Sequence, residues 1–158
     1  MDVIPPRRIF KAALNRDLTA FLERGFRDLD PGKTLCLARY VEYLVAALIE
    51  VAEGRERRLI VNLPPRHLKS VLFSIVFPAW LLGQNPRLRI AVISHSQSLA
   101  HDFALKCHRL VSADWFHEVF PGTSVAPDRS GVMDFETTQG VAATPHRSTL
   151  ALPGGAST

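Results

Sequence analysis

The stretch RRLIVNLPPRHLKS, residues 57–70, decides the fold expected for this chain. Its apolar run Leu59–Leu63 lies between charged residues and a Pro-Pro pair, as a short buried strand would. The apolar sequence that follows, from Lys69 to Leu82, predicts a buried helix that Pro78 bends or shortens. A strand, a tight loop and a helix that begins with Lys-Ser together have the layout of a phosphate-binding loop.

Two leucines depart from the usual phosphate-binding pattern G-x-x-x-x-G-K-[ST], because Leu63 and Leu68 occupy its glycine positions. Lys69 and Ser70 fit the pattern and belong to the first helical turn. Free N–H groups and the helix dipole favour an anion there. The motif alone fits a strand-turn-helix with a surface lysine equally well. The surrounding sequence therefore has to distinguish this interpretation from a phosphate-binding loop.

The loop before Lys69 has few backbone donors, because Pro64 and Pro65 carry no N–H group. The side chains of Arg66 and His67 can supply further donors to a phosphate. The candidate nucleotide-binding residues are therefore Pro65, Arg66, His67, Leu68, Lys69 and Ser70.

A longer run, RRLIVNLPPRHLKSVLFSIVFPAWLLGQNPRLRIAVISHSQSLAHDFALKCHRLV, resembles the large subunit of tailed-phage terminases, the ATP-driven motor that packages viral DNA. FLERGFRDLDPGK upstream and DWFHEVFPGTSV and FETTQG downstream extend the resemblance over residues 15–140. Its most specific part is P-P-R-x-x-K-S followed by F-P-A-W-x-L-G. The resemblance implies a P-loop ATPase in which Lys69 holds the β- and γ-phosphates of ATP and Ser70 ligates Mg²⁺. Arg66 lies where such loops often carry a phosphate-sensing arginine.

The same resemblance implies the partners of the chain: double-stranded DNA, the terminase small subunit and the portal protein, with possible homo-oligomerisation in the full-length family. In the family, an RNase H-like nuclease domain follows the ATPase. ATP hydrolysis also needs a strand-end aspartate and a carboxylate that positions water. Asp134 and Glu136 alternate on the predicted edge strand Val132–Thr138, which lacks the long apolar lead of a Walker B strand. We expect a fragment of the packaging motor that binds nucleotide phosphate and does not hydrolyse ATP alone.

The predicted fold is α/β: a partial P-loop NTPase, with a parallel sheet and flanking helices, preceded by an N-terminal helical segment. Residues 1–56 are assigned to an arm and helices, and residues 57–140 to the partial ATPase core, whose second strand is Leu88–Ile93. Residues 141–158 read as a disordered tail that resembles nothing in the family. A shift of reading frame after Gly140 is a hypothesis for this change.

Apolar spacing and turn signals predict the remaining elements. Pro5-Pro6 is expected to keep the first ten residues irregular. Gly32-Lys33-Thr34 imitates the end of a phosphate-binding loop but has no strand before it, so it is assigned to a turn. The expected helices are Ile9–Arg27, Thr34 or Leu35 to Ala52 (ended by Gly54), Gln97–Val111 (capped by Ser96 or Ser94) and Asp114–Phe120.

Composition adds broad limits. The chain has 158 residues, 47% hydrophobic residues and a formal net charge of +4, which suits a packed domain and a polyanionic partner. Cys36 and Cys107 have no metal-ligand spacing, and His95, His101 and His108 read as solvated. No apolar run approaches the ~18 residues of a membrane span and no signal peptide is recognised, so we expect no membrane partner and a location in the cytoplasm of the bacterial host.

Two other functions stay open. One is a non-enzymatic basic α/β module that binds nucleic acid or a protein, for which DNA binding would depend on salt and not on ATP or Lys69. The other is a different P-loop enzyme, such as a small kinase or helicase fragment. The Pro-Pro loop and the sequence FPAWLLG favour the terminase over this second alternative.

Overall fold

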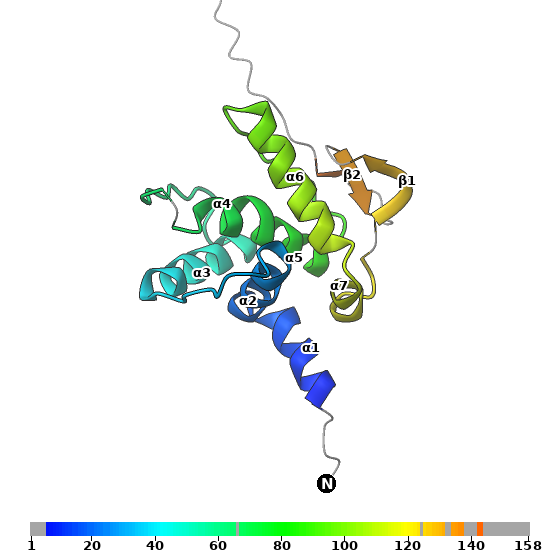
Figure 1. Cartoon of the computed structure of the whole chain (residues 1–158), viewed down its shortest axis with the longest axis horizontal. Coiled ribbons are helices and arrows are strands. Elements are labelled where there is room, and N and C mark those ends of the chain that lie inside the picture. Colours follow the sequence, from blue (N-terminus) through cyan, green and yellow to red (C-terminus); the bar gives the residue numbers. More distant parts are fainter. Residues whose placement is uncertain (1–5, 66, 124, 132–133, 138–141, 144–158) are drawn as a thin grey trace, which may run out of the picture.

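A computed structural model describes residues 6–65, 67–123, 125–131, 134–137 and 142–143 (Figure 1). Helices account for most of this part of the chain. They are α1 (Pro6–Arg16), α2 (Leu18–Leu29), α3 (Arg39–Ala52), α4 (Lys69–Val71), the π-helical segment η1 (Leu72–Val76), α5 (Phe77–Gln84), α6 (Gln97–Val111) and α7 (Asp114–Val119). The strands are β1 (Val125–Gly131), β2 (Asp134–Thr137) and β3 (Ala142–Ala143).

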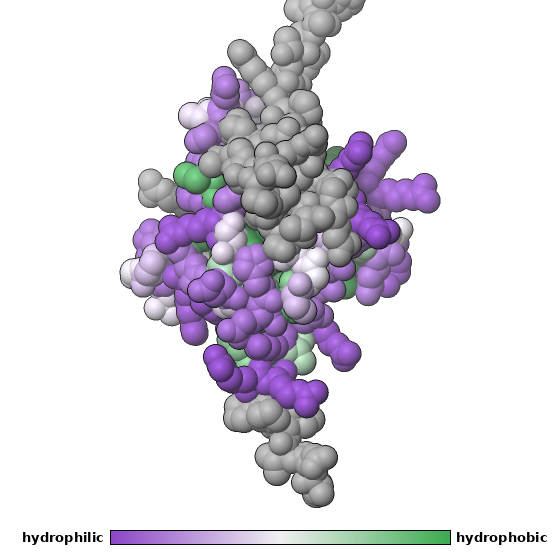
Figure 2. Space-filling view, turned by 90° about the vertical axis from the view of Figure 1, so that its right-hand side faces the viewer, coloured by the Kyte–Doolittle hydropathy of each residue, from purple (hydrophilic) through white to green (hydrophobic). Residues whose placement is uncertain are grey.

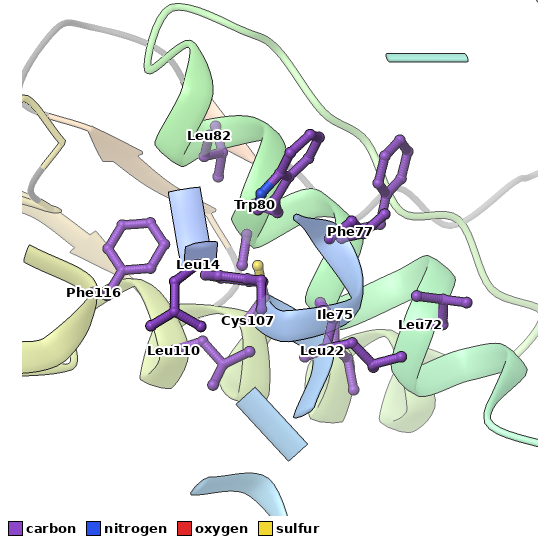
Figure 3. Close-up of a cluster of buried hydrophobic side chains, with 14 of the residues drawn as sticks. Leu14, Leu22, Leu72, Ile75, Phe77, Trp80, Leu82, Cys107, Leu110 and Phe116 are labelled. Atoms are coloured by element: carbon purple, nitrogen blue, oxygen red, sulfur yellow. The ribbon is translucent and has the colours of Figure 1, made fainter. Parts of the chain in front are cut away.

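One continuous helical run, formed by α4, η1 and α5, lies at the centre of the core. It packs against α2 and α6, and Figure 3 shows side chains from several helices meeting there. Cys107 of α6 lies in this cluster with Leu14 of α1 and Leu22 of α2. The largest fully buried side chains are Phe21, Phe116, Leu14, Leu18, Leu22, Leu72, Ile75, Leu82, Leu110, Val41 and Val76. The core is therefore made by helices packed on helices.

The predicted parallel α/β sheet, and with it the partial P-loop NTPase fold, is wrong. Leu59–Leu63 belongs to no strand, and Leu88–Ile93 has a single isolated bridge at Ile90. A strand needs neighbouring strands to satisfy its backbone groups. Neither segment has such a neighbour among the described residues, and the central helical run buries its side chains against other helices instead.

The strands that the structure describes form an antiparallel sheet in the order β1-β2-β3. Gly131 of β1 pairs with Asp134 of β2, and Phe135 of β2 pairs with Ala143 of β3. The expected edge strand Val132–Thr138 thus contains β2, which is the middle strand of the three. Of the expected disordered tail, Ala142–Ala143 forms β3, and residues 141 and 144–158 lie outside the described residues.

The predicted helix Ile9–Arg27 is two helices, α1 and α2, separated at Asp17. The Asp17 carboxylate accepts a hydrogen bond of 2.8 Å from the N–H of Thr19, which caps α2. An aspartate at this position satisfies donors that the first turn leaves free. The first helix also begins earlier than expected, at Pro6, because proline is tolerated in the first turn.

Pro78 does not break the helix that contains it. The segment just before it, η1, is π-helical, and the N–H of Phe77 bonds the carbonyl of Leu72, five residues back. Pro78 has no N–H for a helical bond, and a π-helical turn is a common local adjustment at such a site. The helical run therefore continues from Lys69 to Gln84.

Other helices agree with the sequence predictions. Helix α6 covers Gln97–Val111, and the Ser96 hydroxyl accepts from the N–H of Leu99 as its N-cap. Helix α7 ends one residue before the predicted Phe120. Helix α3 ends at Ala52 before Gly54, whose φ of 74° is the left-handed conformation that glycine adopts readily, although α3 starts at Arg39 and not at Thr34 or Leu35.

Candidate phosphate-binding site

The backbone of Leu68 sets the geometry of the candidate loop. Its φ of 58° and ψ of 1° are left-handed, and it is the one non-glycine residue with positive φ in the described part of the chain. This conformation costs an L-residue other than glycine roughly 1–2 kcal/mol. In the usual phosphate-binding pattern a glycine stands at this position, and glycine adopts positive φ without steric cost.

The first turn of the central helix leaves its N–H groups free. Leu72 donates to the carbonyl of Leu68 at 2.8 Å and closes this turn. The N–H groups of Lys69, Ser70 and Val71 find no hydrogen-bond acceptor within the described residues. Since the helical run continues to Gln84, these three donors lie at the positive end of a long helix.

A cavity of about 570 Å³ lies at this helix start. Lys69 and Ser70 are exposed, and Lys69 forms no ion pair with any described residue. The lysine charge is therefore available to an anion in the cavity. The cavity is lined by Phe26, Asp30, Lys33, Leu63, Pro64, Pro65, His67, Leu68, Lys69, Ser70 and Val71.

His67 is held by its neighbours. Its Nδ1 lies 2.9 Å from the carbonyl oxygen of Pro65, and its ring lies 5.7 Å from the ring of Tyr40. A carbonyl only accepts, so Nδ1 carries a proton and donates. The Nε2 atom can then donate to a phosphate only when the imidazole is protonated. Arg66, the other predicted side-chain donor, lies outside the described residues.

Lys33 and Asp30 were not among the predicted site residues, yet they line the same cavity as Lys69. Lys33 Nζ lies 2.6 Å from Asp30 Oδ2, so these two charges neutralise each other at the rim. Asp30 is the one carboxylate among the described residues that line this cavity, and its oxygens and the Ser70 hydroxyl are of the kind that Mg²⁺ prefers. The sequence assigned Gly32-Lys33-Thr34 to a turn and did not indicate that Lys33 lines the same cavity as Lys69.

A second cavity, of about 580 Å³, shares Lys69 and Ser70 with the first. It is mostly apolar and is lined by residues of the central helical run, of α3, and of the segments Leu59–Leu63 and Leu88–Ile93. Its lining residues are Leu48, Val51, Arg57, Leu59, Val61, Lys69, Ser70, Phe73, Ser74, Phe77, Pro78, Leu81, Ile90, Ala91, Val92 and Ile93.

The acidic residues Asp134 and Glu136 of the predicted edge strand belong to β2. In the described part of the chain, no group of three or more His, Cys, Asp or Glu residues is arranged to hold a metal ion. No described helix has the length and apolar character needed to cross a bilayer.

Comparison with known proteins adds no further assignment. No protein-family model, curated protein or solved structure matches the chain.

Proposed function

We propose that this chain binds the phosphate groups of a nucleoside triphosphate, as Mg·ATP, at the loop Pro65–Ser70. The observation that carries the proposal is the left-handed Leu68 followed by three N–H groups and a Lys69 ammonium that have no partner among the described residues. Free amides at a helix start together with a cation form a binding site for phosphate oxygens.

Each residue has a defined part in this proposal. The N–H groups of Lys69, Ser70 and Val71 donate to phosphate oxygens, and the Lys69 ammonium neutralises their charge. Ser70 Oγ binds the Mg²⁺ that accompanies the nucleotide, with Asp30 as a second candidate oxygen ligand in the same cavity. Bound Mg²⁺ screens the charge of the phosphates. Because the sequence shows neither a Walker B strand nor a carboxylate that would position water, we propose binding without turnover by the chain alone.

The wider role that we propose is that of a fragment of the ATP-driven DNA-packaging motor, the terminase large subunit. It is supported by the sequence resemblance, which centres on the Pro-Pro-Arg-x-x-Lys-Ser loop. In this role the partners are double-stranded DNA, the terminase small subunit and the portal protein, and the chain acts in the cytoplasm of the bacterial host.

Equilibrium binding of a fluorescent ATP analogue with Mg²⁺ tests the proposed site. We expect Lys69→Ala to weaken binding by a factor of about 10 or more, the size expected for loss of a charge-assisted contact. Ser70→Ala should reduce the gain in affinity that Mg²⁺ provides. Lys106→Ala is the control, because Lys106 is a partly buried lysine on α6 that pairs with Asp102 and is not among the described lining residues of the cavity.

Unchanged Mg·ATP binding by Lys69→Ala would refute the proposed site. If the chain instead binds DNA with strong salt dependence, and neither ATP nor Lys69→Ala alters that binding, a basic nucleic-acid-binding module is the better account.

A further inference from the structure

The segment Arg87–His95 has the exposure pattern of a strand, although within the described residues it joins no sheet and has a single bridge, at Ile90. Exposed residues alternate with partly buried ones along its whole length. A period of two means that one face of an extended segment lies against the protein and the other faces outward. The outward residues are Arg87, Arg89, Ala91, Ile93 and His95.

The segment Leu59–Leu63 alternates in the same way from Ile60 onward. Val61 and Leu63 are partly buried, whereas Ile60 and Asn62, which precede them, are exposed. The backbone N–H and C=O groups of residues 59–62 make no hydrogen bond with the described chain. Within the described chain, residues 59–62 therefore have the free backbone groups of an unpaired strand.

Both segments border the apolar cavity of about 580 Å³. Phe73, Phe77 and Leu81 of the central helical run form part of its wall. Ile60 is 89% exposed and Ile93 is 61% exposed, although both are large apolar side chains. Figure 2 shows a largely hydrophilic described surface from another side of the molecule, with only small separate hydrophobic areas.

Arginines flank both segments. Arg57 and Arg58 precede the first, Arg87 and Arg89 begin the second, and all four are exposed. None of them forms an ion pair with a described residue. We name residues 56–63 and 87–93 the strand-docking surface. Within these two ranges Glu56 is the one acidic residue against four arginines, so the ranges together carry a net positive charge.

We propose that the strand-docking surface binds an extended acidic segment of a partner protein by strand addition. The backbone of the partner segment pairs with the N–H and C=O groups of residues 59–62, and its apolar side chains cover Ile60, Ile93 and the cavity. Its acidic residues pair with the flanking arginines.

Charge favours this occupant over two others. A second copy of the chain would bring an equally positive surface against this one, because a two-fold interface uses the same patch on both subunits. A nucleic acid would satisfy the arginines but would leave the apolar side chains and the strand-like backbone unpaired.

A dye-labelled peptide that alternates valine and threonine between terminal glutamates is a suitable probe of the full chain. We expect saturable binding in fluorescence anisotropy. The double variant Ile60→Lys/Ile93→Lys should weaken it by a factor of about 10 or more. Both side chains are exposed, so folding is unaffected, and Tyr43→Lys is the matched control because Tyr43 is 72% exposed on α3.

Two altered peptides test the mode of binding. Methylation of alternate backbone amides should abolish binding if the backbone pairs as a strand, and replacement of the glutamates by lysines should weaken it if the arginines select acidic residues.

The proposal is overturned if the acidic peptide does not bind, or if Tyr43→Lys weakens binding as much as the double variant does. It is also overturned if the chain self-associates through Ile60 and Ile93 without binding peptide. A third contrary result is an oligonucleotide that displaces the peptide through the arginines while both isoleucine substitutions have no effect.

Discussion

Gly83 lies against the ring of Phe120, so closely that a Cβ atom at Gly83 would be only 2.6 Å from Phe120 Cδ2. Gly83 belongs to the last turn of α5, and Phe120 is a buried residue directly after α7. Thr123 supports the same contact, because its hydroxyl donates to the carbonyl of Leu82 at 3.2 Å. The glycine in the sequence FPAWLLG thus lets the chain after α7 pack on the end of α5.

Gly83→Ala should lower the free energy of unfolding. Alanine in place of glycine usually stabilises a helix by about 1 kcal/mol. Here the added methyl would overlap a buried ring, and overpacking typically costs about 1–3 kcal/mol. We expect a net loss of about 1 kcal/mol in urea unfolding. Gly32→Ala is the control, since a Cβ there meets nothing within 4 Å; equal stability of the Gly83 and Gly32 variants would contradict the close contact.

The two tryptophans should respond differently to replacement by phenylalanine. The indole N–H of Trp115 donates to the Asp28 carboxylate, and Arg24 lies 4.7 Å from the Trp115 ring centroid. Trp115→Phe removes this bond and should cost about 1 kcal/mol. The buried indole N–H of Trp80 has no hydrogen-bond partner among the described residues. Trp80→Phe removes an unsatisfied donor, which offsets the lost packing, so it should lower stability less than Trp115→Phe does.

Thermal or urea unfolding of both variants checks this pair of predictions. A larger loss for Trp80→Phe than for Trp115→Phe would mean that the Trp80 indole N–H is satisfied in solution.

Cys107 should make stability depend on alkaline pH. Burial raises the pKa of its thiol from 9.0 to about 12, because a thiolate is poorly solvated in the core. Above pH 9 the unfolded chain loses this proton while the folded chain keeps it. Stability present below pH 9 is therefore lost as the pH rises toward 12. Urea unfolding across this range should show a shallower decline for Cys107→Ala than for wild type, even though the variant is less stable throughout.

The two thiols should also differ in reactivity. Cys36 is exposed and Cys107 is buried, so a thiol reagent should modify Cys36 in the folded protein and Cys107 only on unfolding. Modification of both at the same rate in native buffer would show that the core around Cys107 opens readily.

Leu68 gives a direct test of the left-handed turn. Leu68→Gly and Leu68→Ala both remove the side chain, but only glycine adopts positive φ without cost. We expect the glycine variant to be more stable than the alanine variant by about 1 kcal/mol in urea unfolding. Equal stability, or greater stability of Leu68→Ala, would place Leu68 in an ordinary backbone conformation.

Local signals in the sequence predicted part of this fold. The helix Gln97–Val111 could be predicted because Ser96 and the apolar spacing act within a few residues. The break at Asp17 also had a local cause, the capping carboxylate, but the continuous apolar stripe through it concealed the boundary. The Leu59–Leu63 segment shows what local sequence cannot predict. An apolar run forms a strand only if other strands pair with it, and no strand of the described chain pairs with this segment.

The candidate site was predictable to a similar degree. Lys69 and Ser70 follow from motif spacing, and the structure does place them at a helix start beside a cavity. The conformation of Leu68 could not be inferred, because leucine rarely adopts positive φ. Lys33 and Asp30 could not be found either, since only the packing of α2 near the central helical run brings them to the cavity.

The central claim is that the free N–H groups at the start of the central helix bind nucleotide phosphate. Amide chemical shifts of Lys69, Ser70 and Val71, followed by NMR as Mg·ATP is added to isotope-labelled protein, test it most directly. We predict that these three resonances move most and saturate together, and that adenosine without phosphates leaves them in place. Unchanged resonances at Lys69–Val71 when Mg·ATP saturates the protein, or equal shifts with adenosine, would contradict the account.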